Sequence, residues 1–450
     1  MERYEVFERL GAGGLGEVYR ARDSKLNRFV ALKFLPPEAS LAARERVERE
    51  AQAVAALNHP HICTLHETGE DNGRPFLVLE LLEGETLQAR LARGPGLGLS
   101  EASGLAWLPD SRGVLLTASR PSGAPPQVWE FTVPGGKLVQ LTHDLQGYST
   151  VTAAANGTLA LVHPDPQYSV WVQSKRGGPF QAIPGGGGSQ DGVGGLAWTP
   201  QGRILSIQTP GGRSQFWLEG GSNPPQPIAV PDLPSSATGP VVAPNGQIVF
   251  VDMDPSVLYR VNLDGTGLRQ LAPGMAAFFA TLVQDGKGVA FMSGRTVNHI
   301  YQQPLALVPL AGGTPRQVSR LNLYADYLLT LPGGKRVLDA SSDPQQPGKS
   351  VVEEVALDGA PPVLVKPRAG GMRVPFALTP DGRPLAGVMC KGNVCNIWAA
   401  PLDGGAPYAI THFSDQQIAA FAFAPDGRLA VSRGENNDNA VLATGLGGKK

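Results

Sequence analysis

The fold of most of this chain is set by a short motif, which is clearest as Leu196-Ala197-Trp198-Thr199-Pro200-Gln201-Gly202-Arg203. Three apolar residues lead into a turn that contains proline and glycine, and a second apolar segment follows the turn. Because proline and glycine adopt the backbone angles of tight turns, this order of residues predicts two strands joined by a hairpin. One hairpin is marginally stable in water, so further strands are expected beside it.

The motif recurs along the chain and identifies an internal repeat. Clear copies span residues 105–112, 241–246, 377–383 and 422–428, and weaker copies span residues 151–159, 282–289 and 329–337. A second half, with short strands around a glycine-rich turn, is visible in residues 128–142, 258–271 and 397–411. Copies recur about every 40–48 residues, a spacing typical of four-stranded propeller blades. We count about eight repeat units and expect a β-propeller of seven or eight blades.

The composition agrees with a globular protein that has many turns. The 450 residues include 57 glycines and 40 prolines, while 42% of residues are apolar and 17% are charged. This length predicts two or three domains, or one large repeat domain. The formal net charge of −1 gives no support to binding of nucleic acid or of an anionic membrane.

Compartment signals are few. The N-terminal residues carry charges without an apolar core segment, so no signal peptide is predicted. No apolar run approaches the roughly 20 residues of a membrane-spanning helix. Three cysteines are too few for a disulfide framework and favour a reducing compartment. We therefore expect a soluble, cytoplasmic protein with no membrane segment.

The N-terminal part of the chain follows a different pattern. Leu10-Gly11-Ala12-Gly13-Gly14-Leu15-Gly16-Glu17-Val18 lies between two segments of strand-like composition, residues 4–10 and 17–22. Glycine lets backbone N–H groups approach a phosphate, so a phosphate-binding hairpin tip is expected here. The candidate residues are Gly11, Gly13, Gly14 and Gly16. By itself this pattern is also that of a plain β-hairpin turn.

A strand that carries a lysine follows the glycines. Alternation in residues 29–35 predicts one apolar face, with Val30, Leu32 and Phe34, and an opposite face with Ala31, Lys33 and Leu35. Residues 41–57 are then expected to form a helix, and Glu50 falls on its apolar face. A buried carboxylate needs a cationic partner, for which Lys33 is the candidate. The alternative is that Glu50 reaches solvent from the edge of the apolar stripe.

In their order, these motifs resemble the N-terminal lobe of a bacterial serine/threonine protein kinase. The matches are G-x-G-x-x-G-x-V at residues 11–18, V-A-I-K at residues 30–33, the helix glutamate Glu50, an H-P pair at residues 59–60 and a hinge at residues 80–84. The resemblance covers residues 1–93 and implies a small α+β lobe, an antiparallel sheet with one helix.

The same resemblance implies roles for individual residues. Lys33 would contact the α- and β-phosphates of ATP and Glu50 would orient Lys33. Val18 and Ala31 would cover the adenine. Leu79 would be the gatekeeper, and the backbone from Glu80 to Leu82 would bond the adenine edge.

The second kinase lobe has no counterpart in the sequence. There is no H-R-D and no D-F-G, and the nearest string, His143-Asp144-Leu145, lacks both the arginine and a correctly spaced asparagine. The general base and the magnesium ligands are therefore missing. We predict no catalytic residue, no phosphotransfer by this chain and weak ATP binding at best, and leave magnesium binding open.

From residue 104 the chain resembles the TolB-like, WD-type propellers that follow many bacterial kinase domains. We therefore expect a mainly β protein, with the kinase-like lobe at 1–93, a junction at 94–103, the propeller at 104–446 and a tail at 447–450. The aspartates of the turns are expected to be turn formers rather than calcium ligands. Cys390 and Cys395 could pair across a hairpin in an oxidising space, but two reduced thiols are the expectation, and no metal site is predicted.

The leading hypothesis is a non-catalytic binding protein whose propeller takes a protein or peptide ligand. The alternative is an ATP-binding kinase completed in trans by a separate C-terminal lobe or by dimerisation. A third hypothesis is a non-functional product of an internal deletion that joined a remnant lobe to a propeller.

Overall fold

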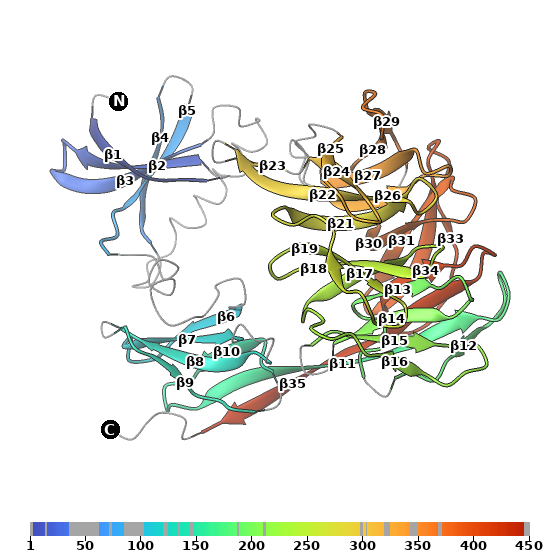
Figure 1. Cartoon of the computed structure of the whole chain (residues 1–450). Helices are drawn as coiled ribbons and strands as arrows, with labels where there is room; N and C mark the ends of the chain where they lie inside the picture. The colour runs from blue at the N-terminus through green and yellow to red at the C-terminus, as the bar shows by residue number, and fades with distance from the viewer. Residues whose placement is uncertain are drawn as a thin grey trace. The chain divides into compact units, whose positions relative to one another are not determined.

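The computed structural model of the chain describes residues 3–13, 16–35, 63–71, 74–84, 103–119, 125–133, 136–144, 147–186, 189–209, 213–297, 300–302, 304–318, 325–342, 350–367 and 371–444. Within these ranges the secondary structure is 35 strands in antiparallel sheets, with no helix (Figure 1). The chain divides into two compact units, Met1–Leu87 with Thr296–Tyr301, and Gln88–Arg295 with Gln302–Lys450. The helix predicted at residues 41–57, and Glu50 with it, lies outside the described residues.

The N-terminal unit contains one five-stranded antiparallel sheet. In sheet order its strands are β1 (Tyr4–Gly13), β2 (Gly16–Asp23), β3 (Arg28–Phe34), β5 (Arg74–Glu80) and β4 (Leu65–Asp71). Its core uses the predicted face of β3, where Val30, Leu32 and Phe34 are buried against Phe76 and Val78 of β5. The alternation of apolar residues in β3 is therefore confirmed.

The hairpin of β1 and β2 is tighter than the sequence suggests. Gly11 pairs with Val18 and Gly13 pairs with Gly16, so the glycine segment is part of the ladder. The expected six-residue tip at residues 11–16 is therefore too long, because extended glycines can continue a two-stranded ladder.

A buried carboxylate fixes the start of this sheet. Asp23 is fully buried and accepts hydrogen bonds from Arg3 Nε at 3.0 Å and Arg3 Nη2 at 2.8 Å. The backbone N–H groups of Lys25 and Leu26 donate to its Oδ1. Arg3 Nη1 also reaches Glu67 Oε2 at 2.7 Å, which joins β4 to the network. The bidentate geometry satisfies a charge that would otherwise be costly to bury.

The second unit is built from repeated four-stranded sheets. The first is β13 (Gly195–Trp198), β14 (Ile204–Gln208), β15 (Gln215–Glu219) and β16 (Gln226–Ile228). The second is β17 (Ala237–Val242), β18 (Gln247–Asp252), β19 (Val257–Asn262) and β20 (Arg269–Gln270). The third is β21 (Ala276–Val283), β22 (Gly288–Val297), β24 (Leu305–Pro309) and β25 (Arg316–Gln317), with β23 (Ile300–Gln302) also paired to β22.

Two further sheets follow the same plan. One is β26 (Ala325–Thr330), β27 (Arg336–Ser342), β28 (Ser350–Ala356) and β29 (Val363–Val365). The other is β30 (Arg373–Leu378), β31 (Pro384–Lys391), β32 (Val394–Pro401) and β33 (Tyr408–Ala409). In each sheet the first two strands flank a turn of the recurring motif, which confirms the predicted hairpins.

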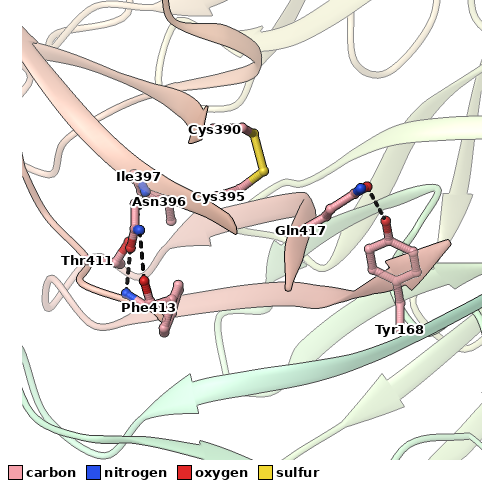
Figure 2. Close-up of a disulfide and its surroundings, with 8 residues drawn as sticks. All are labelled: Tyr168, Cys390, Cys395, Asn396, Ile397, Thr411, Phe413 and Gln417. Atoms are coloured by element: carbon pink, nitrogen blue, oxygen red, sulfur yellow. Dashed lines mark hydrogen bonds between the residues drawn. A yellow bond between two sulfur atoms is a disulfide. The ribbon is translucent and has the colours of Figure 1, made fainter. Parts of the chain in front are cut away.

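The sixth sheet joins distant parts of the chain. It contains β34 (Gln417–Phe423), the first half of β35 (Leu429–Ala443), the second half of β11 (Leu159–Gln173) and β12 (Phe180–Ala182). Val170 pairs with Ser432 and Val172 pairs with Ala430. The Tyr168 hydroxyl also donates to Gln417 Oε1 at 3.3 Å, across the same sheet (Figure 2).

The first strands of these six sheets contact one another in the cyclic order β13, β17, β21, β26, β30, β34 and back to β13. Each pair of adjacent sheets shares an apolar cluster; the one that completes the circle contains Val170, Leu196 and Ala420. The middle strands are buried on both faces, as in β18, where residues 248–251 are four consecutive buried apolar residues. Six sheets form this ring, so the prediction of seven or eight blades is wrong.

The two repeat units left over lie outside the ring. Residues 103–140 form their own sheet of β6 (Ser103–Trp107), β7 (Gly113–Ala118), β8 (Gln127–Thr132) and β9 (Leu138–Gln140). Strand β10 (Thr150–Ala153) pairs with the first half of β11, whose other edge pairs with the second half of β35. Leu115 and Val128 pack against Val151, Leu159 and Leu161, which gives this region a core of its own.

A shared hydrogen-bond pattern shows that the sheet at 103–140 is built like the sheet at 373–409. Thr411 Oγ1 donates to Asn396 Oδ1 at 2.9 Å and accepts from the Ile397 N–H at 2.8 Å (Figure 2). Thr142 makes the same two bonds, to Gln127 Oε1 at 2.8 Å and from the Val128 N–H at 2.9 Å. The second half of the repeat is thus confirmed at the level of single side chains.

Candidate functional site

The kinase-type residues of the N-terminal unit lie on one face of its sheet. Val18 pairs with Lys33, and Lys33 pairs with Leu77 on the next strand. Ala31 pairs with Leu79 two residues along. Opposite residues of an antiparallel pair point to the same side, so these five side chains share the face opposite the core.

The lysine on this face is half-buried beside apolar neighbours. Ala31 is 8% exposed, and Leu77 and Leu79 are half-buried. None of the described acidic side chains forms an ion pair with Lys33. Glu50, the partner that the sequence suggests, lies outside the described residues, so the proposed ion pair stays a prediction.

The glycine segment is described only in part. At Gly11 an added Cβ would meet no atom within 4 Å, so the backbone there is open on the side where a side chain would stand. Gly13 and Gly16 are placed only as backbone partners in the ladder, and Gly14 lies outside the described residues. The open backbone at Gly11 is compatible with close approach of a ligand.

At the predicted hinge, the Glu80 backbone is already engaged. Its N–H donates to the Thr64 carbonyl at 2.9 Å, and its carbonyl accepts from Cys63 Sγ at 3.6 Å. Leu82 is 66% exposed and Gly84 has a φ of 124°. Burial raises the pKa of the Cys63 thiol, so this sulfur acts as a neutral donor. The free backbone groups for an adenine edge are thus those after Glu80.

The second candidate site is a cavity inside the ring. It has a volume of about 990 Å³ and is lined by residues from all six first strands. The lining is mostly apolar, and its half-buried aromatic residues are Trp198, Phe279, Tyr327, Phe376 and Phe423. A cavity of this size and polarity is typical of ligand-binding sites.

Polar groups in this cavity are few. Arg373, exposed at the start of β30, is the one charged residue among the described residues that line it. Thr281 Oγ1 and Thr330 Oγ1 are 2.9 Å apart, so the Thr281 hydroxyl is already bonded. Burial raises the pKa of Tyr327 to about 12, which keeps its phenol neutral. The cavity therefore favours an apolar ligand that carries a negative charge.

A pair of buried carboxyl groups was missed by sequence reasoning. Glu219 is fully buried and accepts hydrogen bonds from Ser206 Oγ at 2.9 Å and Gln208 Nε2 at 3.1 Å. Asp191 is 4% exposed. Burial raises the pKa of Asp191 to about 6 and that of Glu219 to about 7, and the nearby Asp191 charge also raises the pKa of Glu219. The sequence signal was an acidic residue at the end of a buried apolar strand.

The turn aspartates behave as expected from the sequence. Oδ1 of Asp110, Asp381 and Asp426 accepts the backbone N–H two residues later. Such local bonds stabilise turns. Among the described residues there is also no group of three or more His, Cys, Asp or Glu side chains that could hold a metal ion.

Cys390 and Cys395 form a disulfide, so the expectation of two reduced thiols is wrong (Figure 2). The two residues are opposite each other in β31 and β32, with a Cα–Cα distance of 4.1 Å. The Cys395 N–H donates to Gln416 on the far side, so this is a non-hydrogen-bonded pair, in which side chains lie closest. The two-residue turn at Gly392-Asn393 sets this register.

The comparisons with known proteins show similarity in the N-terminal part of the chain. The protein kinase domain model matches residues 4–107. The chain is 42% identical over 95 residues to serine/threonine-protein kinase PknD of Mycobacterium tuberculosis, which covers 20% of this chain and 14% of that protein. It is 47% identical over 95 residues to PknB of Mycolicibacterium smegmatis, covering 19% and 15%. It is 45% identical over 91 residues to PksC of Streptomyces coelicolor, covering 19% and 16%.

These relatives extend far beyond the matched segment, because the chain spans about a seventh of their length. The N-terminal portion is thus similar to bacterial serine/threonine kinases, as the motifs predict. Within the described residues, no helix combines the length and the apolar character needed to cross a bilayer.

Proposed function

We propose that this chain is a non-catalytic binding protein, in which a six-bladed β-propeller holds a protein or peptide ligand and the N-terminal unit is a kinase-like lobe. The observation that carries the proposal is that the repeat region follows the kinase-like hinge without the motifs of a second kinase lobe. The hinge segment is described to Gly84, and the first strand of the repeat region begins at Ser103. No H-R-D or D-F-G occurs there or elsewhere in the sequence.

Phosphoryl transfer depends on positioning and on charge stabilisation by metal ions. In kinases the second lobe supplies the base and the magnesium ligands. The lobe of this chain offers one lysine and backbone dipoles toward a triphosphate. ATP would therefore bind weakly, since good pockets enclose roughly 70–90% of a ligand and this face walls one side only.

The ring is the part suited to binding. Its six sheets share continuous apolar cores, and the last sheet ties residues 168–182 to residues 417–434. Closure of this kind makes a rigid frame around the central cavity. A rigid, preformed cavity loses little conformational entropy when a ligand enters it.

The enzymatic part of the proposal is tested with the full chain and a Lys33→Met variant. Phosphate transfer from ATP to a generic basic protein is expected to stay at the same background in both. Calorimetry with ATP and Mg²⁺ is expected to give no sub-micromolar affinity. Transfer that disappears in Lys33→Met would overturn the proposal and favour a kinase completed by a partner, whose addition should then raise the rate.

The binding part is tested by selecting a random peptide library on the immobilised full chain. Selected peptides are expected to bind the Lys33→Met variant equally well, because the ring and not the kinase-like lobe holds them. A library that yields no binder, or binders that need Lys33, would contradict the propeller as the binding element.

A further inference from the structure

We propose that the ring cavity binds the free C-terminal end of an apolar peptide, with the terminal carboxylate on Arg373 and the last side chains among the aromatic residues. This inference rests on the proposed binding function and adds the chemistry of the ligand. It follows from the lining, the charge, the free strand edges and the backbone of the six first strands.

The lining fixes the apolar part of the ligand. Phe279, Tyr327 and Phe376 come from three successive ring strands, and Trp198 and Phe423 come from the strands that meet where the ring closes. The rings of Phe279 and Tyr327 lie 6.1 Å apart, and those of Tyr327 and Phe376 lie 5.8 Å apart. Aromatic walls of this kind gain most from burying aliphatic or aromatic side chains.

The charge fixes the polar part. The Arg373 guanidinium forms no ion pair or hydrogen bond with any described group, and no acidic residue among the described ones lines the cavity. Val374, which follows Arg373 in β30, and Met253, which follows β18, are apolar lining residues about half exposed. A single guanidinium in apolar surroundings matches one carboxylate well. A phosphate group, with nearly two negative charges, would lack a second cation.

The strand edges favour a peptide over a fatty acid. Each ring strand is the end strand of its sheet and pairs with one neighbour only. The second edge of each lies outside its ladder, and these strands surround the cavity. Some groups on these edges are already bonded, as the Gly239 N–H is to the Gly194 carbonyl at 3.1 Å. An extended peptide can hydrogen-bond such an edge, whereas an acyl chain has no groups to do so.

One strained residue lies in the same wall. Phe279 has a φ of 46°, in the left-handed region that favours glycine. In β17 the corresponding bulge position is Gly239, with a φ of 60°. The bulge in β21 thus carries a large aromatic side chain where its neighbour carries none, at a cost of about 1–3 kcal/mol. Such strain gathers at binding sites, and here it holds an aromatic ring at the cavity.

The test compares two probes by calorimetry, acetyl-Leu-Leu-Phe with a free carboxylate and the same peptide as its C-terminal amide. The acid is expected to bind about 10- to 100-fold more tightly, the range for a hydrogen bond to a charged group. Arg373→Gln should remove this difference while leaving the affinity for the amide unchanged. Arg383→Gln, an exposed arginine in the next turn of the same sheet, is the matched control and should keep the difference.

Three outcomes would overturn the inference: equal binding of acid and amide, a preference that survives Arg373→Gln, or binding of decanoate in place of both peptides. Thermal melts of each variant confirm folding. If peptides selected from the library bind equally well with either end, the proposed function stands and this inference fails. If no peptide binds and Lys33-dependent phosphotransfer appears, the proposed function fails as well.

Discussion

Trp198 donates its indole N–H to the backbone carbonyl of Ala422 at 3.0 Å, which joins the first strand of the first ring sheet to the first strand of the last. The Arg428 guanidinium lies 4.8 Å from the centre of the Trp198 ring and covers the contact. Residues 224 positions apart are thus held together at the point where the ring closes.

Trp198→Phe is expected to lower the free energy of unfolding of the ring by about 1–3 kcal/mol, because the Ala422 carbonyl loses its donor. Urea unfolding followed by circular dichroism measures this change. Trp217→Phe is the control, since the Trp217 indole bonds only to Gln215 in the same strand, at 3.3 Å. If Trp217→Phe lowers the free energy of unfolding as much as Trp198→Phe does, the hydrogen bond from Trp198 to Ala422 has no special role in closing the ring.

The buried Glu219 predicts that stability falls as pH rises. Its folded pKa of about 7 lies above the unfolded value near 4.5, so between these values the folded state holds a proton that the unfolded state has released. Stability is then full below pH 4.5 and declines toward pH 7, by on the order of 3 kcal/mol. Glu219→Gln should flatten this slope in urea unfolding at a series of pH values. The exposed Glu435→Gln should leave it unchanged.

The buried Asp23 predicts the opposite slope at lower pH. The hydrogen bonds from Arg3 lower the pKa of Asp23 to about 2, against 3.8 in the unfolded chain. The carboxylate therefore stabilises the N-terminal unit above pH 4, and this contribution is lost as pH falls toward 2. Asp23→Asn should cost about 2 kcal/mol at neutral pH, the range for hydrogen bonds to a charged group.

Hydrogen exchange of β1 and β2 amides measures this effect within the unit. Glu8→Gln is the control, because Glu8 is 65% exposed in its ion pair with Arg20 and such pairs contribute little. If the β1 and β2 amides are equally protected from exchange in Asp23→Asn and in Glu8→Gln, the Asp23 network does not anchor the sheet.

The cysteines give a direct chemical test. Thiol titration of the unreduced, denatured chain is expected to find one free thiol, Cys63, of the three cysteines. Closing so short a loop should contribute about 2 kcal/mol by restricting the unfolded chain. Dithiothreitol should therefore lower the urea midpoint of the wild type and not that of Cys390→Ala/Cys395→Ala. Three free thiols would show that the two side chains are adjacent but unbonded.

Local patterns predicted much of this structure. The alternation around Lys33 gave the correct faces of β3, and each copy of the proline–glycine motif gave a hairpin where expected. These features depend on residues that are close in sequence. They are the alternation of side chains along a strand, the residues of the turn, and the pairing register that a short turn imposes on its hairpin.

Long-range pairing was not predictable in the same way. The count of repeats suggested seven or eight blades, but β11 and β35 are long strands of one sheet whose outer halves extend beyond the ring, and the first two units lie outside the ring. Nothing in the local sequence at Val170 indicates that its partner is Ser432. The buried Glu219 was missed for a related reason, because its burial depends on long-range packing. The disulfide was missed for another reason: the hairpin of Cys390 and Cys395 was predicted, but a reducing compartment was expected.

The pairing of β11 with β35 also sets the order in which this protein can be completed. A ribosome makes residues 168–182 long before residues 417–434, yet the two segments form one sheet. Until residues 417–434 are made, the half of β11 that belongs to the ring has an apolar face that is not covered and one edge that is not paired. Translation that stops before residue 417 would therefore release an open arc of five sheets, with an exposed edge at which a second chain could pair.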